Sequence, residues 1–381
     1  MTRSSRSATS FRFTIAALFV FVALASGCGD DALDQGFDGL KPVEEQPGSG
    51  NGTPDSTPPD STPPVETEEP IEPIDRELPV SEPIAEEPTV CGVCEDVPAL
   101  DSLTTYPIVL AHGMAGFNEF GPIQYWVGVE ERLRSLGYAV YVAVVDPLNG
   151  SDVRGKQLAA YIDRVLACTC AEKVNIIAHS QGGIDSRVVV DAMGYGDRVA
   201  SVTTIATPHR GSLFSDIGLG LVPGNLDPII NFLGWMLAEV YTDPLEEVEV
   251  RATLLWMSTE HLENFANDYP TDTSVDWISY AGRAGITALG WPECVDVPLP
   301  NPVAKAPLTL PLLATWTLLG GLAGVDNDGL VTVDSSKWGD FRGCLPADHI
   351  QEIGMFIGVP QVFDHLAFFQ QHVELLVARG H

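Results

Sequence analysis

Beyond Tyr106, short apolar runs alternate with stretches of helical spacing. The apolar runs span residues 106–111, 138–145, 173–178 and 199–206. Uninterrupted runs of this length are typical of strands that are buried on both faces of a parallel sheet. The helical stretches between them cover residues 125–136 and 155–167. This alternation predicts an α/β fold with a mostly parallel central sheet and helices on both faces, in one domain from residue 91 to residue 381.

The segment before this domain has a different pattern. Residues 29–90 contain 12 prolines and 17 Asp or Glu residues, against two basic residues. Such a composition cannot bury enough apolar surface to fold, and its prolines keep the chain extended. We therefore interpret residues 29–90 as a disordered acidic linker.

The N-terminus predicts export. Three arginines accompany an apolar run at residues 15–25, which is too short to span a bilayer and suits the core of a signal peptide. The string L-A-S-G-C, which ends at Cys28, resembles a bacterial lipoprotein signal, in which Cys28 becomes the lipidated N-terminus. Residues 1–28 are interpreted as this signal, with an outer-membrane or cell-surface location. Cleavage after Ala25, which would release a secreted soluble protein, is the alternative.

Charge and cysteine content narrow the function further. The formal net charge is -32, and an acidic surface repels nucleic acid, so no nucleic-acid partner is expected. An even number of cysteines follows Cys28, which predicts disulfides in an exported chain. A zinc site is the alternative, and the exported location argues against it. The expected pairs join Cys294 to Cys344, and Cys91 and Cys94 to Cys168 and Cys170.

The strongest chemical signal is the string A-H-S-Q-G-G at residues 178–183. It follows an apolar strand and precedes a predicted helix that begins near Gly183, which is the setting of a nucleophile elbow. The tight turn strains the serine, so the residues two before and two after it must be small. The first of these is Ala178 where glycine is usual. This pattern identifies Ser180 as the candidate nucleophile, at the positive end of a helix.

A second strand ends in the string A-H-G-M-A-G at residues 111–116. Two backbone N–H groups are needed to stabilise the oxygen that gains negative charge during acyl transfer. We expect one from Met114 and the other from Gln181, directly after the nucleophile. Alone, the string also fits an ordinary glycine turn, but the downstream elbow favours the catalytic interpretation.

These strings resemble the secreted family I triacylglycerol lipases of bacteria. The resemblance rests on Y-P-I-V-L-A-H-G-M-A-G, V-R-G-K-Q-L, K-V-N-I-I-A-H-S-Q-G-G and S-V-T-T-I-A-T-P-H-R-G-S between residues 106 and 212, and resumes from residue 307. It implies the α/β-hydrolase fold and a serine ester hydrolase, a lipase or carboxylesterase acting on medium- to long-chain lipids. It also implies a helical lid at the apolar segment 212–246, for which a buried core helix is the alternative.

The acid and the base follow the nucleophile in the chain order of this fold. Asp328, in N-D-G-L-V, matches the family's acid, and His349, in H-I-Q-E-I, matches its catalytic histidine. His365 is the runner-up for the base, whereas His112 and His179 are expected to be structural. In the expected mechanism His349 accepts the serine proton, and Asp328 holds the histidine tautomer.

Two further expectations come from the resemblance. Arg154, in V-R-G-K-Q-L, matches an arginine that steadies the oxyanion loop, although a solvent-exposed charge at a helix start is equally open. The family usually binds calcium near the catalytic histidine through two Asp carboxylates. Here no Asp or Glu occurs between Asp296 and Asp326, and Gln351 stands at the second position, two residues after the histidine. Calcium favours carboxylates, so this site is expected to be lost, and no metal or other cofactor is expected.

The expected partners are a lipid or ester substrate and, through the lipid anchor, a membrane. The chain is expected to be a monomer, and a lipase-specific foldase stays open as a partner. Two alternatives for the function are a polyester depolymerase or an acyltransferase that uses the same triad. The third is a non-catalytic surface binding module, against which the complete set of Ser180, Asp328 and His349 argues.

Overall fold

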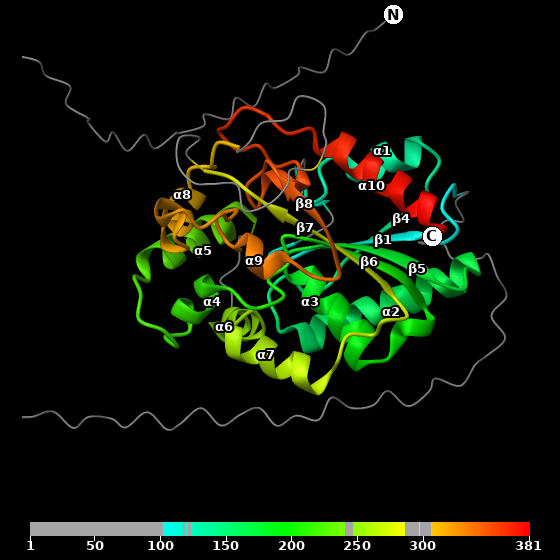
Figure 1. The fold of residues 1–381 in the computed structure, drawn as a ribbon, viewed down its shortest axis with the longest axis horizontal. Coiled ribbons are helices and arrows are strands. Elements are labelled where there is room, and N and C mark those ends of the chain that lie inside the picture. Colours follow the sequence, from blue (N-terminus) through cyan, green and yellow to red (C-terminus); the bar gives the residue numbers. More distant parts are fainter. Residues whose placement is uncertain (1–101, 117–118, 121–122, 241–246, 286–296, 298–305) are drawn as a thin grey trace, which may run out of the picture. The chain divides into compact units, whose positions relative to one another are not determined.

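The structure is a computed structural model that describes residues 102–116, 119–120, 123–240, 247–285, 297 and 306–381 (Figure 1). All of them belong to the second of the two units into which the chain divides, Ile74–His381. The predicted signal peptide and linker lie outside the described residues, as do Cys91, Cys94 and Cys294. No described helix is both long enough and apolar enough to cross a membrane.

A six-stranded sheet with parallel neighbours forms the centre of this unit, in the order β4-β1-β5-β6-β7-β8. The strands are β1 (Ile108–Ala111), β4 (Val140–Ala143), β5 (Val174–His179), β6 (Val199–Ile205), β7 (Asp276–Gly282) and β8 (Asp340–Leu345). The first four confirm the four predicted strands. β7 and β8 are additional, because polar residues such as Ser279 and Arg342 interrupt their apolar pattern. A separate antiparallel hairpin pairs β2 (Glu119–Phe120) with β3 (Ile123–Gln124).

Helices cover both faces of the sheet, as predicted (Figure 1). Successive side chains of β1 point to opposite faces. Ile108 and Leu110 share an apolar cluster with α1 (Val129–Ser135) and α10 (His365–Arg379). Val109 and Ala111 share another cluster with α2 (Ser151–Thr169). α1 and α2 therefore confirm the two predicted helices.

The chain after the nucleophile position is helical from an earlier point than predicted. α3 (Gln181–Arg187) begins directly after Ser180, which occupies its N-cap position, and not near Gly183. It continues into a π-helical turn, η1 (Val188–Ala192). The first N–H groups of α3 therefore lie beside Ser180 itself, which is where a helix attracts negative charge.

A third apolar cluster joins helices α4 (Leu213–Gly218), α5 (Asp227–Val240), α6 (Glu247–Trp256) and α8 (Leu312–Leu318). We call these four helices the helical cap; Figure 1 shows them grouped beside one another. The segment predicted as a lid supplies α4 and α5, and residues 241–246 lie outside the described part. The remaining helices are η2 (Tyr195–Asp197), α7 (Thr259–Asp268), η3 (Gly321–Ala323), α9 (Val333–Ser336) and η4 (Gln351–Ile353).

Candidate active site

Ser180 lies in the turn between β5 and α3, and its backbone is strained. Its φ is 56° and its ψ is -129°, a region that residues with a side chain seldom adopt. Two residues later, a Cβ on Gly182 would lie only 2.4 Å from the carbonyl oxygen of Ala111. β1 and α3 therefore approach so closely that glycine is required, and this packing holds the strained turn in place.

The structure brings together the three residues that the sequence selects as a triad. Oγ of Ser180 lies 2.9 Å from Nε2 of His349, and Nδ1 of His349 lies 2.8 Å from Oδ2 of Asp328. All three side chains are buried. The second carboxylate oxygen of Asp328 accepts hydrogen bonds from the backbone N–H groups of Leu330 and Val331, at 2.8 and 2.7 Å. Both oxygens of the acid are thus fixed, which orients the imidazole toward the serine.

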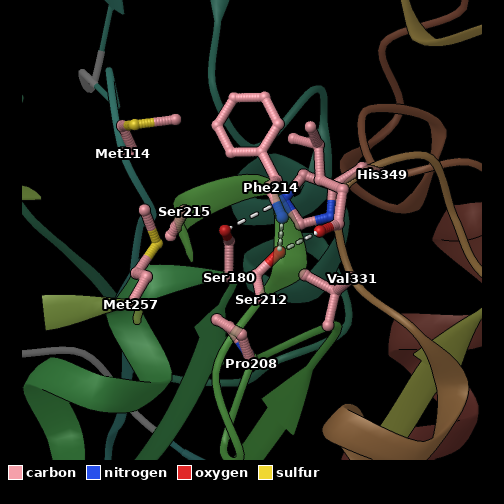
Figure 2. A pocket seen from close by; sticks show the side chains of 10 residues that line it. Met114, Ser180, Pro208, Ser212, Phe214, Ser215, Met257, Val331 and His349 are labelled. Atoms are coloured by element: carbon pink, nitrogen blue, oxygen red, sulfur yellow. Dashed lines mark hydrogen bonds between the residues drawn. The ribbon is translucent and has the colours of Figure 1, made fainter. Parts of the chain in front are cut away.

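Ser180 and His349 line a small pocket (Figure 2). The rest of its lining is mostly apolar, and part of it comes from the helical cap. The other lining residues are Met114, Pro208, Ser212, Phe214, Ser215, Met257, Leu330 and Val331. An apolar wall beside a nucleophile suits an acyl chain better than a charged group.

Met114 lines the same pocket as Ser180, and Gln181 directly follows Ser180 in the chain. Neither the N–H of Met114 nor that of Gln181 donates a hydrogen bond to another described residue. The loop that carries Met114 is anchored by Ala115, whose φ is 56° and whose N–H donates to the carbonyl of Pro147 at 2.7 Å. The side chain of Gln181 is held separately, because its Nε2 donates to the carbonyl of Asn149 at 2.8 Å.

Arg154 is fully buried and braces the same loop. Its Nη2 donates to the carbonyl of His112 at 2.8 Å, and its Nε donates to Oδ2 of Asp185 at 2.9 Å. A third donor, Nη1, reaches the carbonyl of Asp146. Arg154 thus holds the backbone of the loop that carries Met114, and the alternative of a solvent-exposed charge is wrong.

Two other histidines have structural surroundings. Nε2 of His365 donates to the carbonyl of Val127 at 2.8 Å, so the runner-up base makes no contact with the nucleophile or the acid. His112 accepts the N–H of Val145 on Nε2 at 3.2 Å. Burial and the neighbouring Arg154 lower the pKa of His112 to about 3, which keeps it uncharged.

A buried network behind the catalytic histidine goes beyond the sequence-based expectations. The rings of His179 and His349 lie 4.6 Å apart between centroids. Nδ1 of His179 lies 2.7 Å from the hydroxyl of Tyr125, which accepts the N–H of Gly113 at 2.9 Å. Nε2 of His179 lies 3.0 Å from Oε2 of Glu352. The network therefore links the oxyanion loop to the surroundings of the triad.

Glu352 is a carboxyl group in an environment that opposes its charge. It is fully buried against the bare Cα of Gly282 in β7, where a Cβ would lie 1.7 Å from Oε1. Oε1 has no hydrogen-bond partner among the described residues. Burial raises the pKa of Glu352 well above its ordinary value, and the nearby carboxylates of Asp328 and Asp348 raise it further. Both effects favour the protonated, uncharged form of Glu352. The only signal for Glu352 in the sequence is its place three residues after His349, in the string H-I-Q-E.

Three side chains that carry potential metal-ligand atoms lie close together at His349. Ligand atoms of His179, His349 and Glu352 all lie within 4.8 Å of one another. Their ring nitrogens, however, are already engaged with Ser180 and the buried carboxyl groups. At residue 351, where the resemblance implied a calcium-binding carboxylate, Nε2 of Gln351 donates instead to the carbonyl of Pro307 and to Asp348. A cation there would meet an N–H donor, so these residues do not fit calcium.

The described cysteines, Cys168, Cys170 and Cys344, are each disulfide-bonded. A zinc site built from the thiolates of Cys168 and Cys170 therefore does not fit. The expected pairing stays a prediction, since the proposed partners lie outside the described residues.

A scan against protein-family models finds no match. Among curated proteins, the triacylglycerol lipases of Pseudarthrobacter phenanthrenivorans and Burkholderia plantarii are each 33% identical to this chain over 317 residues. The matched part covers 73% of this chain, 98% of the first lipase and 87% of the second.

Solved structures show the same architecture. The mature form of lipase BlEst2 from Bacillus licheniformis matches with a TM-score of 0.52 and 18% identity, over 74% of this chain and 96% of that one. The metagenomic carboxyl esterase MGS0156 matches with a TM-score of 0.52 and 15% identity, over 74% of this chain and 79% of that one. At these identities the likeness concerns the fold alone, and it confirms the predicted α/β-hydrolase fold.

Proposed function

The chain belongs to the triacylglycerol lipase family, and we propose that it cleaves acyl esters with Ser180 as nucleophile, His349 as base and Asp328 as acid. It is a serine ester hydrolase of the lipase or carboxylesterase type. The observation that carries the residue assignment is the unbroken hydrogen-bond chain from the Ser180 hydroxyl through the imidazole to the Asp328 carboxylate.

The first half of the reaction forms an acyl-enzyme. Oγ of Ser180 attacks the ester carbonyl while Nε2 of His349 takes its proton. Asp328, held by two backbone N–H groups, stabilises the imidazolium. The carbonyl oxygen gains negative charge, and in this proposal the backbone N–H groups of Met114 and Gln181 stabilise it.

The second half releases the acid. His349 gives its proton to the departing alcohol oxygen, which leaves the acyl group on Ser180. The imidazole then takes a proton from a water molecule as that water attacks the acyl carbonyl. Collapse of the second tetrahedral intermediate returns the proton to Ser180 and frees the carboxylic acid.

The preferred substrates in this proposal are medium- to long-chain lipids. The pocket is mostly apolar, and large apolar side chains are exposed in the helical cap and in the segments next to α8. Ile230 in α5 is 60% exposed, Leu310 before α8 is 78% exposed, and Leu322 in η3 is 59% exposed. Exposed large apolar side chains favour contact with a lipid phase. α4 and α5 would act as the lid that moves when this contact forms.

The test uses esters of graded length. Wild type should cleave p-nitrophenyl esters of medium and long acyl chains and emulsified triglyceride, and Ser180→Ala should remove this activity while the fold is kept. A serine-directed phosphonate should label wild type and not Ser180→Ala. Absence of labelling would favour a non-catalytic binding module, and activity restricted to short esters would contradict the lipid preference.

For location, we propose an exported lipoprotein that is anchored through Cys28, with residues 29–90 as an acidic tether. The support is the small-residue string before Cys28 and the proline-rich, acidic composition after it. A secreted soluble form is the alternative. A monomer remains our expectation for the catalytic domain, and dependence on a foldase stays open.

We further propose that the enzyme works without calcium. Gln351 stands where the resembling lipases have a calcium-binding carboxylate, and its amide N–H groups donate to Pro307 and Asp348. Neither its activity nor its thermal stability should then depend on calcium.

A further inference from the structure

Asp348, directly before the catalytic histidine, collects an unusual number of hydrogen bonds. Its Oδ1 accepts the backbone N–H groups of Ile350 and Gln351, at 3.2 and 3.0 Å. Its Oδ2 accepts the backbone N–H of Thr309 at 2.6 Å and Nε2 of Gln351 at 2.9 Å. The carboxylate is fully buried. Four donors around one buried carboxylate fix its position closely, because they satisfy both oxygens from several directions away from water.

The amide of Gln351 extends this arrangement to a second segment. Besides Asp348, Nε2 donates to the carbonyl oxygen of Pro307 at 2.8 Å. Its Oε1 accepts the backbone N–H of Asp348 at 3.3 Å. The amide thus uses donor and acceptor together and is itself fully buried. Two oxygens from distant parts of the chain converge on one NH₂ group, as they would converge on a cation.

The catalytic histidine lies between the two ends of this arrangement. Asp348 precedes His349, and Ile350 and Gln351 follow it. The backbone N–H of His349 donates to the carbonyl of Asp328 at 3.0 Å, so the loop is also tied to the acid. The position of the loop therefore sets the 2.9 Å contact between Nε2 and Ser180.

We propose that the amide of Gln351 and the carboxylate of Asp348 form a bracket that positions His349. This inference rests on the proposed function of His349 as the base. Gln351 is a positioning residue, since it touches neither substrate nor the reacting atoms. The bracket ties the segment at Pro307 and Thr309, just before α8, to the histidine loop.

The experiment compares Gln351→Met, Gln351→Glu and the control Gln361→Ala. Methionine keeps the volume and loses all the amide's hydrogen bonds, while glutamate keeps the shape and loses the donor. Gln361 is exposed and lies on the following segment, outside the bracket. Steady-state kinetics on a soluble p-nitrophenyl ester are measured below the melting temperature of every variant, with circular dichroism as the check of folding.

Both Gln351 variants should lower kcat by about 10- to 100-fold with KM within about twofold, because a small displacement of a catalytic group is costly. Gln361→Ala should match wild type. A Gln351 variant that melts earlier but keeps wild-type kcat would overturn the proposal, as would loss of wild-type activity in EDTA that calcium restores. If one variant does not fold, the other decides. Activity that persists in Ser180→Ala would instead count against the proposed function itself.

Discussion

Replacing Glu352 by glutamine should leave catalysis almost unchanged, and the reason is the missing charge. Burial and two nearby carboxylates raise the pKa of this carboxyl, and we therefore expect it to stay protonated at neutral pH. Glutamine has the same size and can still accept the N–H of His179. In Glu352→Gln a neutral group therefore replaces a neutral group.

The geometry gives the size of the effect that an ionised Glu352 would have on His349. Ligand atoms of Glu352 and His349 lie at most 4.8 Å apart. An ionised Glu352 would stabilise protonated His349 by about 3.5 kcal/mol at an effective dielectric constant of about 20. Removing that charge would move the acid limb of the kcat/KM profile down by about 2.5 pH units. For the neutral carboxyl we expect a movement of less than about 0.5 unit, with kcat/KM within about fivefold of wild type.

Stability gives an independent measurement with a defined sign. With its pKa raised, Glu352 should keep its proton in the native state at pH values where the unfolded chain, with the ordinary value of 4.5, releases it. Wild type therefore loses about 1.4 kcal/mol of stability per pH unit from this group as the pH rises toward its native pKa. Glutamine does not titrate and therefore contributes no such pH dependence. The free energy of unfolding of Glu352→Gln, relative to wild type, should rise by the same amount per unit.

The assay pairs a kcat/KM profile from pH 5 to 9 on a soluble p-nitrophenyl ester with denaturant unfolding at three pH values. Glu352→Ala serves as the contrast, because it opens a cavity and removes the acceptor for His179. Two results would refute a neutral Glu352. One is a downward movement of the acid limb by about two pH units in Glu352→Gln. The other is a difference in unfolding free energy between Glu352→Gln and wild type that does not change with pH.

Four further outcomes are expected. His349→Ala should lower kcat by at least ~1,000-fold, whereas His365→Ala should retain most activity, and the reverse ranking in esterase assays would reassign the base. Arg154→Ala should destabilise the fold by about 3–5 kcal/mol in denaturant unfolding, because it leaves a buried carboxylate unpaired; a change below 1 kcal/mol would contradict this. EDTA should alter neither activity nor Tm, and a loss that calcium restores would sink the calcium-free proposal. Cys28→Ala should move the enzyme from the membrane fraction to the soluble one; a mature N-terminus at Ser26, without lipid, would disprove the anchor.

The parts of the fold and site that the sequence predicts depend on local patterns. The strand before Ser180 is continuously apolar, and the turn after it needs small residues, so both can be recognised without the fold. β7 and β8 carry polar side chains within the strand and lack such a signature. Their burial comes from partners that are distant in sequence.

The network around the triad could not be predicted for the same reason. Burial raises the pKa of Glu352, and the nearby Asp328 raises it further; Asp328 and Gly282, against which Glu352 packs, belong to other segments. Gln351 stands out in the sequence as a missing carboxylate, but its hydrogen bond to Pro307 appears only when the chain is folded. Departures from a motif are visible in a sequence, whereas the groups that compensate for them are visible in three dimensions.

The reacting groups and part of the pocket wall come from different elements of the fold, and this has an evolutionary consequence. The reacting groups follow the ends of sheet strands or rest on loops tied to them, while Phe214 and Ser215 come from a cap helix. Mutations in the cap can therefore remodel the acyl-binding wall with little disturbance to the nucleophile. Descendants of such a protein could diversify toward new esters by exchanging cap segments, and directed evolution of selectivity would profitably begin with libraries in α4 and α5.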